Sequence, residues 1–251
     1  MARPGRAWWS RLEVVRFLEA ALVRAVPRDH LESDRVFRRR RVVVAVTACL
    51  GAVLVGVSFQ LAPGDPRFYL TTGALALVWT LGSLVSGPLH LGWAHTRSGS
   101  RLVRPVVQSL ALGLLAVAVF CAGAVVVARV PVLRDHVNDV LDHARFSLLP
   151  VVAVITVVNG VAEELFFRGA LYAAIGRRYP VLVSTGLYAL TTVASANPML
   201  VFAAAVLGLL VGRQRRVTGG VLGPMVTHAT WSLSMLFLLP VLLGALAGTS
   251  P

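Results

Sequence analysis

Most of the chain after residue 41 consists of apolar stretches whose lengths suit helices that cross a membrane. About 20 residues, each rising 1.5 Å, span the ~30 Å hydrocarbon core of a bilayer. We place seven such stretches at residues 42–62, 69–93, 104–129, 147–175, 181–196, 199–213 and 220–247, of which the fifth and sixth are short. The sequence therefore predicts an all-α fold, a polytopic membrane helical bundle with about seven transmembrane helices.

The arginines predict how these helices are oriented. The sequence has no lysine, so arginine alone provides the positive charge behind its net charge of +13. Arginines gather in the second, fourth and sixth loops, whereas the other loops are neutral or balanced by acidic residues. Because cytoplasmic loops collect positive charge, we expect the amino terminus inside and the carboxyl terminus outside, in a multi-pass protein of the cytoplasmic membrane. The arginines of these three loops are Arg97, Arg101, Arg104, Arg177, Arg178, Arg213, Arg215 and Arg216.

Residues 1–41 form a basic segment that we expect on the cytoplasmic side. From Trp8 to Val26, apolar and charged residues partly separate at helical spacing, which is typical of an amphipathic helix lying on a membrane surface. The run Arg38–Arg41 abuts the first span, where it would meet anionic lipids or form a solvated charge run. Outside this segment the sequence has no basic stripe with interleaved aromatic residues, so nucleic acid is not an expected partner.

Glu163 and Glu164 are the two acidic residues, out of eleven, that fall within a predicted span. A carboxylate in hydrocarbon is energetically costly, so an adjacent pair indicates a functional site that faces a polar cavity. The alternative is a structural pair, in which one glutamate binds Arg168 and the other completes a buried hydrogen-bond network. Asn159, one turn before Glu163, either lines the same cavity or makes an interhelical hydrogen bond.

His228 is the one histidine that lies well inside a predicted span. By helix rise it lies about 12 Å, and Glu163 about 18 Å, from the cytoplasmic ends of their antiparallel spans. We therefore expect a carboxylate and an imidazole to meet in one cavity in the cytoplasmic half of the membrane. In such a cavity a glutamate can act as the general base on a water molecule.

The string Glu163-Glu164-Leu165-Phe166-Phe167-Arg168 resembles the EExxxR signature of the CAAX-protease and bacteriocin-processing family (CPBP, or Abi), whose members are intramembrane peptidases. The resemblance covers about residues 147–235. Family members carry a second motif, FxxxH, one helix later and a third, HxxxN or HxxxD, near the carboxyl terminus. By position the second motif falls on Tyr188 and Thr192, with threonine in place of histidine. The third falls on His228 and Ser232, with serine in place of asparagine.

The resemblance implies hydrolysis of a peptide bond in a membrane-embedded or lipidated peptide or protein. Glu163 would activate the water, Glu164 and Arg168 would orient the site, and His228 would bind a metal or stabilise the oxyanion. Four residues are auxiliary candidates: Asn159, Tyr188, Thr192 and Ser232. The hydroxyls of Thr192 and Ser232 could donate hydrogen bonds to a developing oxyanion.

The resemblance leaves the cofactor open between zinc and no metal. Zinc usually takes three protein ligands from histidine, cysteine, aspartate or glutamate. The candidates inside spans are Glu163, Glu164 and His228, with a neutral hydroxyl at Thr192.

The chain divides by these arguments into three segments. Residues 1–41 are the basic segment with its interfacial helix, 42–146 hold accessory transmembrane helices and an extracytoplasmic loop, and 147–247 form a CAAX-protease-like core. The leading hypothesis is an intramembrane endopeptidase of the CAAX or Abi type. The alternatives are a catalytically inactive relative that serves as a membrane scaffold or immunity protein, and a small transporter whose glutamates carry protons or cations.

Overall fold

The computed structural model describes residues 13–27, 33–96 and 101–248, and almost all of its ordered elements are helices. Trp8, His30 and Arg97 lie outside these residues. In chain order the elements are α1 (Glu13–Leu22), α2 (Asp34–Gln60), α3 (Arg67–Ser86), β1 (Ala94–His95), β2 (Leu102–Val103), α4 (Val106–Val127), α5 (Pro131–Arg145), α6 (Leu149–Glu164), a π-helix η2 (Leu165–Leu171), α7 (Tyr172–Ile175), α8 (Pro180–Thr192), a 3₁₀ turn η3 (Val193–Ser195), α9 (Pro198–Thr218) and α10 (Leu222–Leu246). The all-α fold is thus confirmed.

Six helices of the described chain are long and apolar enough to cross a membrane, and a seventh apolar helix, Pro180–Ser195, is shorter. Their outward faces are apolar as well. On α2, for example, Val42, Val46, Leu50, Val53 and Val57 are exposed at helical spacing. Such a face is unfavourable in water and suits contact with lipid tails, so the chain is a polytopic membrane bundle.

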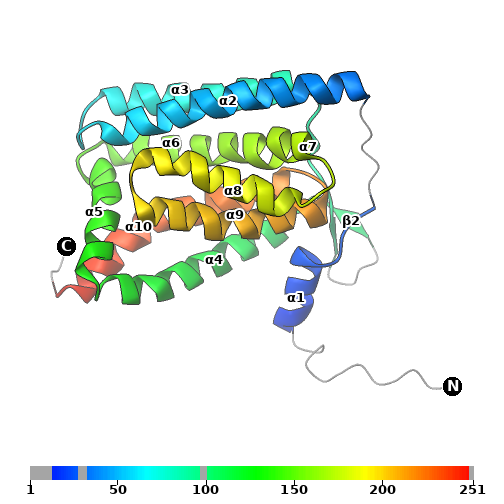
Figure 1. The fold of residues 1–251 in the computed structure, drawn as a ribbon. Helices are drawn as coiled ribbons and strands as arrows, with labels where there is room; N and C mark the ends of the chain where they lie inside the picture. The colour runs from blue at the N-terminus through cyan, green and yellow to red at the C-terminus, as the bar shows by residue number, and fades with distance from the viewer. Residues whose placement is uncertain (1–12, 28–32, 97–100, 249–251) are drawn as a thin grey trace.

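The bundle has three layers (Figure 1). Helices α2 and α3 lie side by side along one side, α4 lies along the opposite side, and α6, α8, α9 and α10 lie between them. Helix α5 crosses one end of the bundle, here called the α5 end. Helix α1 and the antiparallel β1–β2 pair lie at the other, the α1 end.

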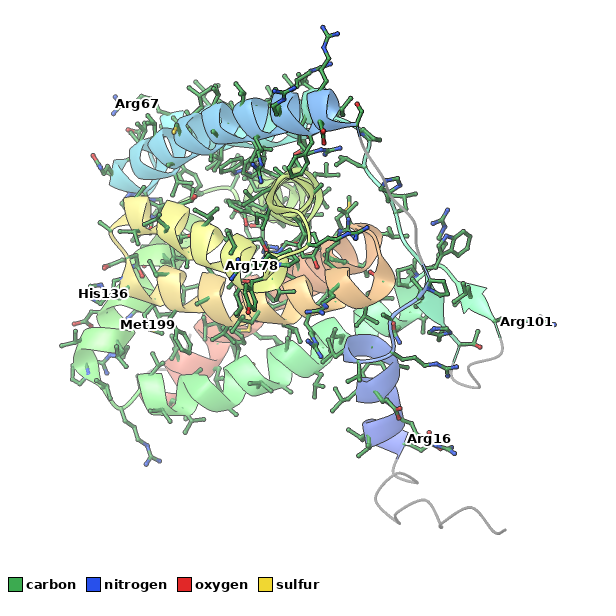
Figure 2. All side chains as sticks on the ribbon, turned by 45° about the vertical axis from the view of Figure 1, so that its right-hand side comes forward. Arg16, Arg67, Arg101, His136, Arg178 and Met199 are labelled. Carbon is green, nitrogen blue, oxygen red and sulfur yellow. The ribbon has the colours of Figure 1, made fainter. Side chains whose placement is uncertain are left out.

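Charged side chains are found at both ends of the bundle (Figure 2). Arg16 and Arg101 lie at the α1 end, whereas Arg67 and His136 lie at the α5 end. Helix α1 runs across the direction of the bundle helices (Figure 1), as an interfacial helix would if those helices span the bilayer.

The arginine run at the start of α2 packs against other helices and is not merely a solvated charge run. Arg40 is fully buried and donates to the Ser86 hydroxyl (3.3 Å) and to the Pro88 carbonyl (3.2 Å). Arg39 donates to the Val85 carbonyl and Arg41 to the Ala174 carbonyl. These arginines therefore satisfy carbonyls at the ends of α3 and α7, which have no partner within their own helices.

Several predicted boundaries were wrong. Helix α2 begins at Asp34, ahead of the predicted residue 42, because the arginines continue the helix. Helix α3 ends at Ser86 instead of near residue 93, since Gly87 has φ 144° and Pro88 follows it. The sixth span is full length, at 21 residues.

The segment after α3 and the loop after α4 also hold structure that the sequence analysis left out. The strands β1 and β2 pair beyond the end of α3. Helix α5 occupies the predicted extracytoplasmic loop and contacts α4, α6, α9 and α10.

A cluster of aromatic rings ties the α2–α3 pair to the centre of the bundle. The Trp79 indole stacks on Phe166 at 4.5 Å between ring centroids and lies 5.1 Å from Phe167. All three side chains are at most 1% exposed. Gly51 makes this packing possible, because a Cβ at that position would overlap the indole. The cluster fixes the segment that follows the paired glutamates.

Candidate active site

Two adjacent elements carry the EExxxR signature. Helix α6 ends at Glu164, and the next seven residues, Leu165–Leu171, form a π-helix that contains Arg168. A π-helix is rare, and such segments occur frequently at functional sites. Every residue from Phe166 to Tyr172 is buried, because α2, α3, α7, α8 and α9 all contact this segment. The chain is therefore helical from Leu149 to Ile175, beginning two residues after the predicted start of this span at 147, and the helix type changes directly after the two glutamates.

Glu164 lies at the centre of a fully buried ion cluster. Its Oε1 atom accepts from Arg168 Nη1 at 3.2 Å and lies 2.8 Å from His228 Nδ1. The side chains of Glu164 and Arg168 are 0% exposed, and that of His228 is 6% exposed. Since His228 is 64 residues away on α10, the fold brings together the two parts of the chain that the sequence analysis expected to meet.

Glu163 lies beside this cluster and is more accessible. Its side chain is 20% exposed, and its Oε2 atom lies 4.0 Å from His228 Nε2. The same oxygen accepts a 2.5 Å hydrogen bond from the Tyr188 hydroxyl on α8. The two neighbouring carboxylates thus differ, because Glu164 is enclosed by ionic partners whereas Glu163 reaches the accessible side of the cluster.

The Arg168 guanidinium is held by its surroundings. It lies over the Tyr188 ring, 4.7 Å from the centroid, and Arg215 donates to the Arg168 carbonyl at 2.7 Å. Gly208 on α9 leaves room for it, since a Cβ there would lie 3.0 Å from Arg168 Nη2. A stacked guanidinium in this setting provides positive charge close to both carboxylates.

Several buried polar atoms of the cluster have no hydrogen-bond partner among the described residues. These are Glu164 Oε2, Arg168 Nε, Arg168 Nη2 and Thr185 Oγ1. Thr185 was not a sequence candidate, although it precedes Tyr188 by three residues and so shares its helix face. Buried polar groups without partners are uncommon, and a catalytic role is one explanation for them.

The auxiliary candidates are less closely involved. Asn159 Nδ2 donates to the Ile155 carbonyl at 3.1 Å, and its Oδ1 atom is buried without a partner in the described chain. The Thr192 hydroxyl donates to the Tyr188 carbonyl at 2.9 Å. Ser232 is half-buried on α10, one turn after His228. Of these four candidates, Tyr188 is the one that the structure joins to Glu163.

The side chains at this site do not fit a three-ligand zinc centre. Within the described ranges, no three histidine, cysteine, aspartate or glutamate side chains are placed to hold a metal ion. His228 Nδ1 and Glu164 Oε1 are bonded to one another, which leaves His228 Nε2 and Glu163 as two donors. Zinc in proteins usually takes three or four such ligands.

Comparison with known families locates a match over this region. Residues 145–234 match the family model described as type II CAAX prenyl endopeptidase Rce1-like. The matched segment contains Glu163, Glu164, Arg168, Tyr188 and His228. The match confirms the resemblance that the EExxxR string predicted. No curated protein and no solved structure matches the chain.

Proposed function

We propose that this multi-pass membrane relative of the Rce1-like CAAX proteases is an intramembrane endopeptidase. It would cleave a peptide bond of a membrane-embedded or lipidated peptide or protein, with Glu163 as the base that activates water. The observation that carries the proposal is the pairing of Glu164 with His228 at 2.8 Å directly beside the more accessible Glu163. Amide hydrolysis is accelerated by a general base for the water and by a hydrogen-bond donor for the oxyanion, and this arrangement offers a candidate for each.

The reaction begins with the removal of a proton from water by Glu163. The resulting hydroxide adds to the carbonyl carbon, and the electron pair of the C=O double bond moves to oxygen and forms an oxyanion. The intermediate then collapses: the C–N bond breaks, and Glu163 passes its proton to the leaving nitrogen. The products are a carboxylic acid and an amine, so the proton removed from water is returned and all atoms balance.

His228 would stabilise the oxyanion through its Nε2–H group. Donation from both ring nitrogens requires the imidazolium form, with Nδ1–H directed at Glu164 and Nε2–H at the oxyanion. Glu164 Oε1 lies 2.8 Å from Nδ1 and can accept the first of these hydrogen bonds, and Arg168 compensates the second negative charge of the glutamate pair. Glu164 and Arg168 thus act as positioning residues.

We also propose the orientation predicted from the arginines, with the α1 end in the cytoplasm. Arg35, Arg38, Arg177, Arg178 and Arg213 are exposed near that end, where they would contact anionic headgroups of the cytoplasmic membrane.

The test uses purified protein in nanodiscs with a library of membrane peptides, both lipidated and unmodified. We expect wild type to cleave a subset of peptides, Glu163→Gln to lose about 10²–10⁴-fold in kcat, and His228→Gln about 10²–10³-fold. Addition of a chelator should leave the wild-type rate unchanged. Binding of peptides without cleavage by wild type would support the inactive scaffold instead, an outcome motivated by the substitutions at Thr192 and Ser232.

A further inference from the structure

We infer that Tyr188 is the positioning residue of the catalytic base, and that its hydroxyl compensates for the histidine missing at position 192. The inference rests on the proposed function of Glu163. It concerns a side chain whose counterpart in the FxxxH motif is a phenylalanine, which has no hydroxyl to donate. The chain therefore differs from the motif twice on one helix, with a phenol gained at Tyr188 and an imidazole absent at Thr192.

Tyr188 contacts Glu163 directly. The hydroxyl donates to Glu163 Oε2 at 2.5 Å, which is the short end of the range for O–H donation to a carboxylate. His228 Nε2 lies 4.0 Å from the same oxygen, beyond hydrogen-bond distance. Among the described residues, Tyr188 is thus the side chain whose hydrogen bond orients this carboxylate.

The Tyr188 side chain is itself held in place by its neighbours. Its ring is buried. The centroid of the Tyr188 ring lies 4.5 Å from that of Phe167 and 4.7 Å from the Arg168 guanidinium. A hydroxyl on a ring held in this way can direct Glu163 at little further entropic cost. Because Oε2 accepts the hydrogen bond of the phenol, we assign the activation of water to Oε1.

The Thr192 hydroxyl does not orient Glu163. It donates to the Tyr188 carbonyl on its own helix. A threonine side chain is also shorter than a histidine and presents no ring nitrogen. Tyr188 and Thr192 lie one turn apart on the same face of α8, so the phenol hydroxyl comes from the helix face on which the motif places its histidine.

The experiment compares kcat and KM of wild type with Tyr188→Phe, Thr192→His and the double variant Tyr188→Phe/Thr192→His in nanodiscs. Removal of the hydroxyl alone should lower kcat about 10–100-fold with KM within about twofold, since a misplaced base slows chemistry without weakening substrate binding. The double variant restores both motif residues and should recover most of the lost kcat. A merely structural role for the hydroxyl predicts no such rescue.

Tyr69→Phe is the matched control. The Tyr69 hydroxyl accepts from the Leu148 amide at 3.0 Å near the start of α6, at the α5 end, so its removal costs a hydrogen bond but should leave kcat unchanged. Full kcat in Tyr188→Phe, together with loss of activity in Glu163→Gln, would overturn this inference and leave the proposed function intact. If Tyr188→Phe does not fold, a folded double variant that remains inactive would overturn it as well. A wild type that cleaves nothing would overturn the proposed function first, and the inference with it.

Discussion

The position of the buried Arg168 side chain depends on a glycine, Gly208, which has no side chain to displace it. Its guanidinium is 0% exposed, is bonded to Glu164, and approaches α9 at Gly208. A Cβ at Gly208 would lie 3.0 Å both from Arg168 Nη2 and from Thr185 Cγ2. The guanidinium lies at the end of a long side chain and can move by a few tenths of an ångström, which would shift its ionic partner too.

We therefore expect Gly208→Ala to reduce kcat about tenfold while the protein still folds, because even small displacements of catalytic groups are costly. The matched control is Gly186→Ala on the neighbouring α8, where a Cβ would meet nothing within 4 Å. Both variants are assayed for peptide cleavage and for thermal unfolding in detergent. Equal rates in the two variants would show that the position of Arg168 does not limit the reaction.

The residues of the cluster could be predicted from the sequence to different degrees. Glu163, Glu164 and His228 stand out because ionisable groups are rare in hydrocarbon and require partners there. Tyr188 was a candidate only through its position in the second motif, since a tyrosine on an apolar helix has an ordinary role at membrane interfaces. Its bond to Glu163 depends on the distance between α6 and α8, which no local pattern encodes.

At the scale of elements, the packing of α2 on α3 depends on small residues. Gly51 admits the Trp79 indole, and Gly82 lies against Thr47, where a Cβ would overlap the threonine side chain. Small residues allow membrane helices to approach closely, which matters because lipid provides no hydrophobic drive for their association. This pair also supports the aromatic cluster around Phe166 and Phe167.

Gly51→Ala should destabilise the protein by about 1–3 kcal/mol, the usual cost of overpacking a core. Gly73→Ala on α3 is the control, since a Cβ there meets nothing within 4 Å and alanine favours helix. The measurement is the unfolding midpoint of each variant in the same detergent. A midpoint of Gly51→Ala equal to that of Gly73→Ala would contradict the packing described for Trp79.

The spans were predictable as elements because length and apolar character are local properties. Among the elements that were not predicted, the π-helix and α5 were missed for different reasons. The π-helix of Leu165–Leu171 depends on how five other helices pack around it. The sequence of α5 does contain a helix pattern, with proline at the first position and apolar residues at helical spacing: Pro131, Leu133, Val137 and Leu141. Its acidic residues nevertheless favoured the interpretation as a loop.

The molecule as a whole has an α1 end and an α5 end, and we predict that the α1 end faces the cytoplasm. In a chain with Cys49 and Cys121 replaced by alanine, Asp139→Cys on α5 should react with a membrane-impermeant maleimide in intact cells. Arg178→Cys at the opposite end should react only after permeabilisation, because arginine-rich ends stay in the cytoplasm. Both parent side chains are exposed, so access within the protein is comparable. The reverse pattern of labelling would contradict the proposed orientation.

The ion pair between Glu164 and Arg168 also bears on how the chain enters the membrane during synthesis. The helix that carries these residues is made well before α10, so His228 is not yet there to accompany Glu164. On a biological insertion scale each such charge costs about 2.5–3.5 kcal/mol at the centre of a helix. Because Arg168 lies four residues after Glu164, the two can neutralise each other on the same helix as it leaves the translocon. Glu164 thus has a counter-ion of its own from the start, and His228 completes the cluster only when the last helix arrives.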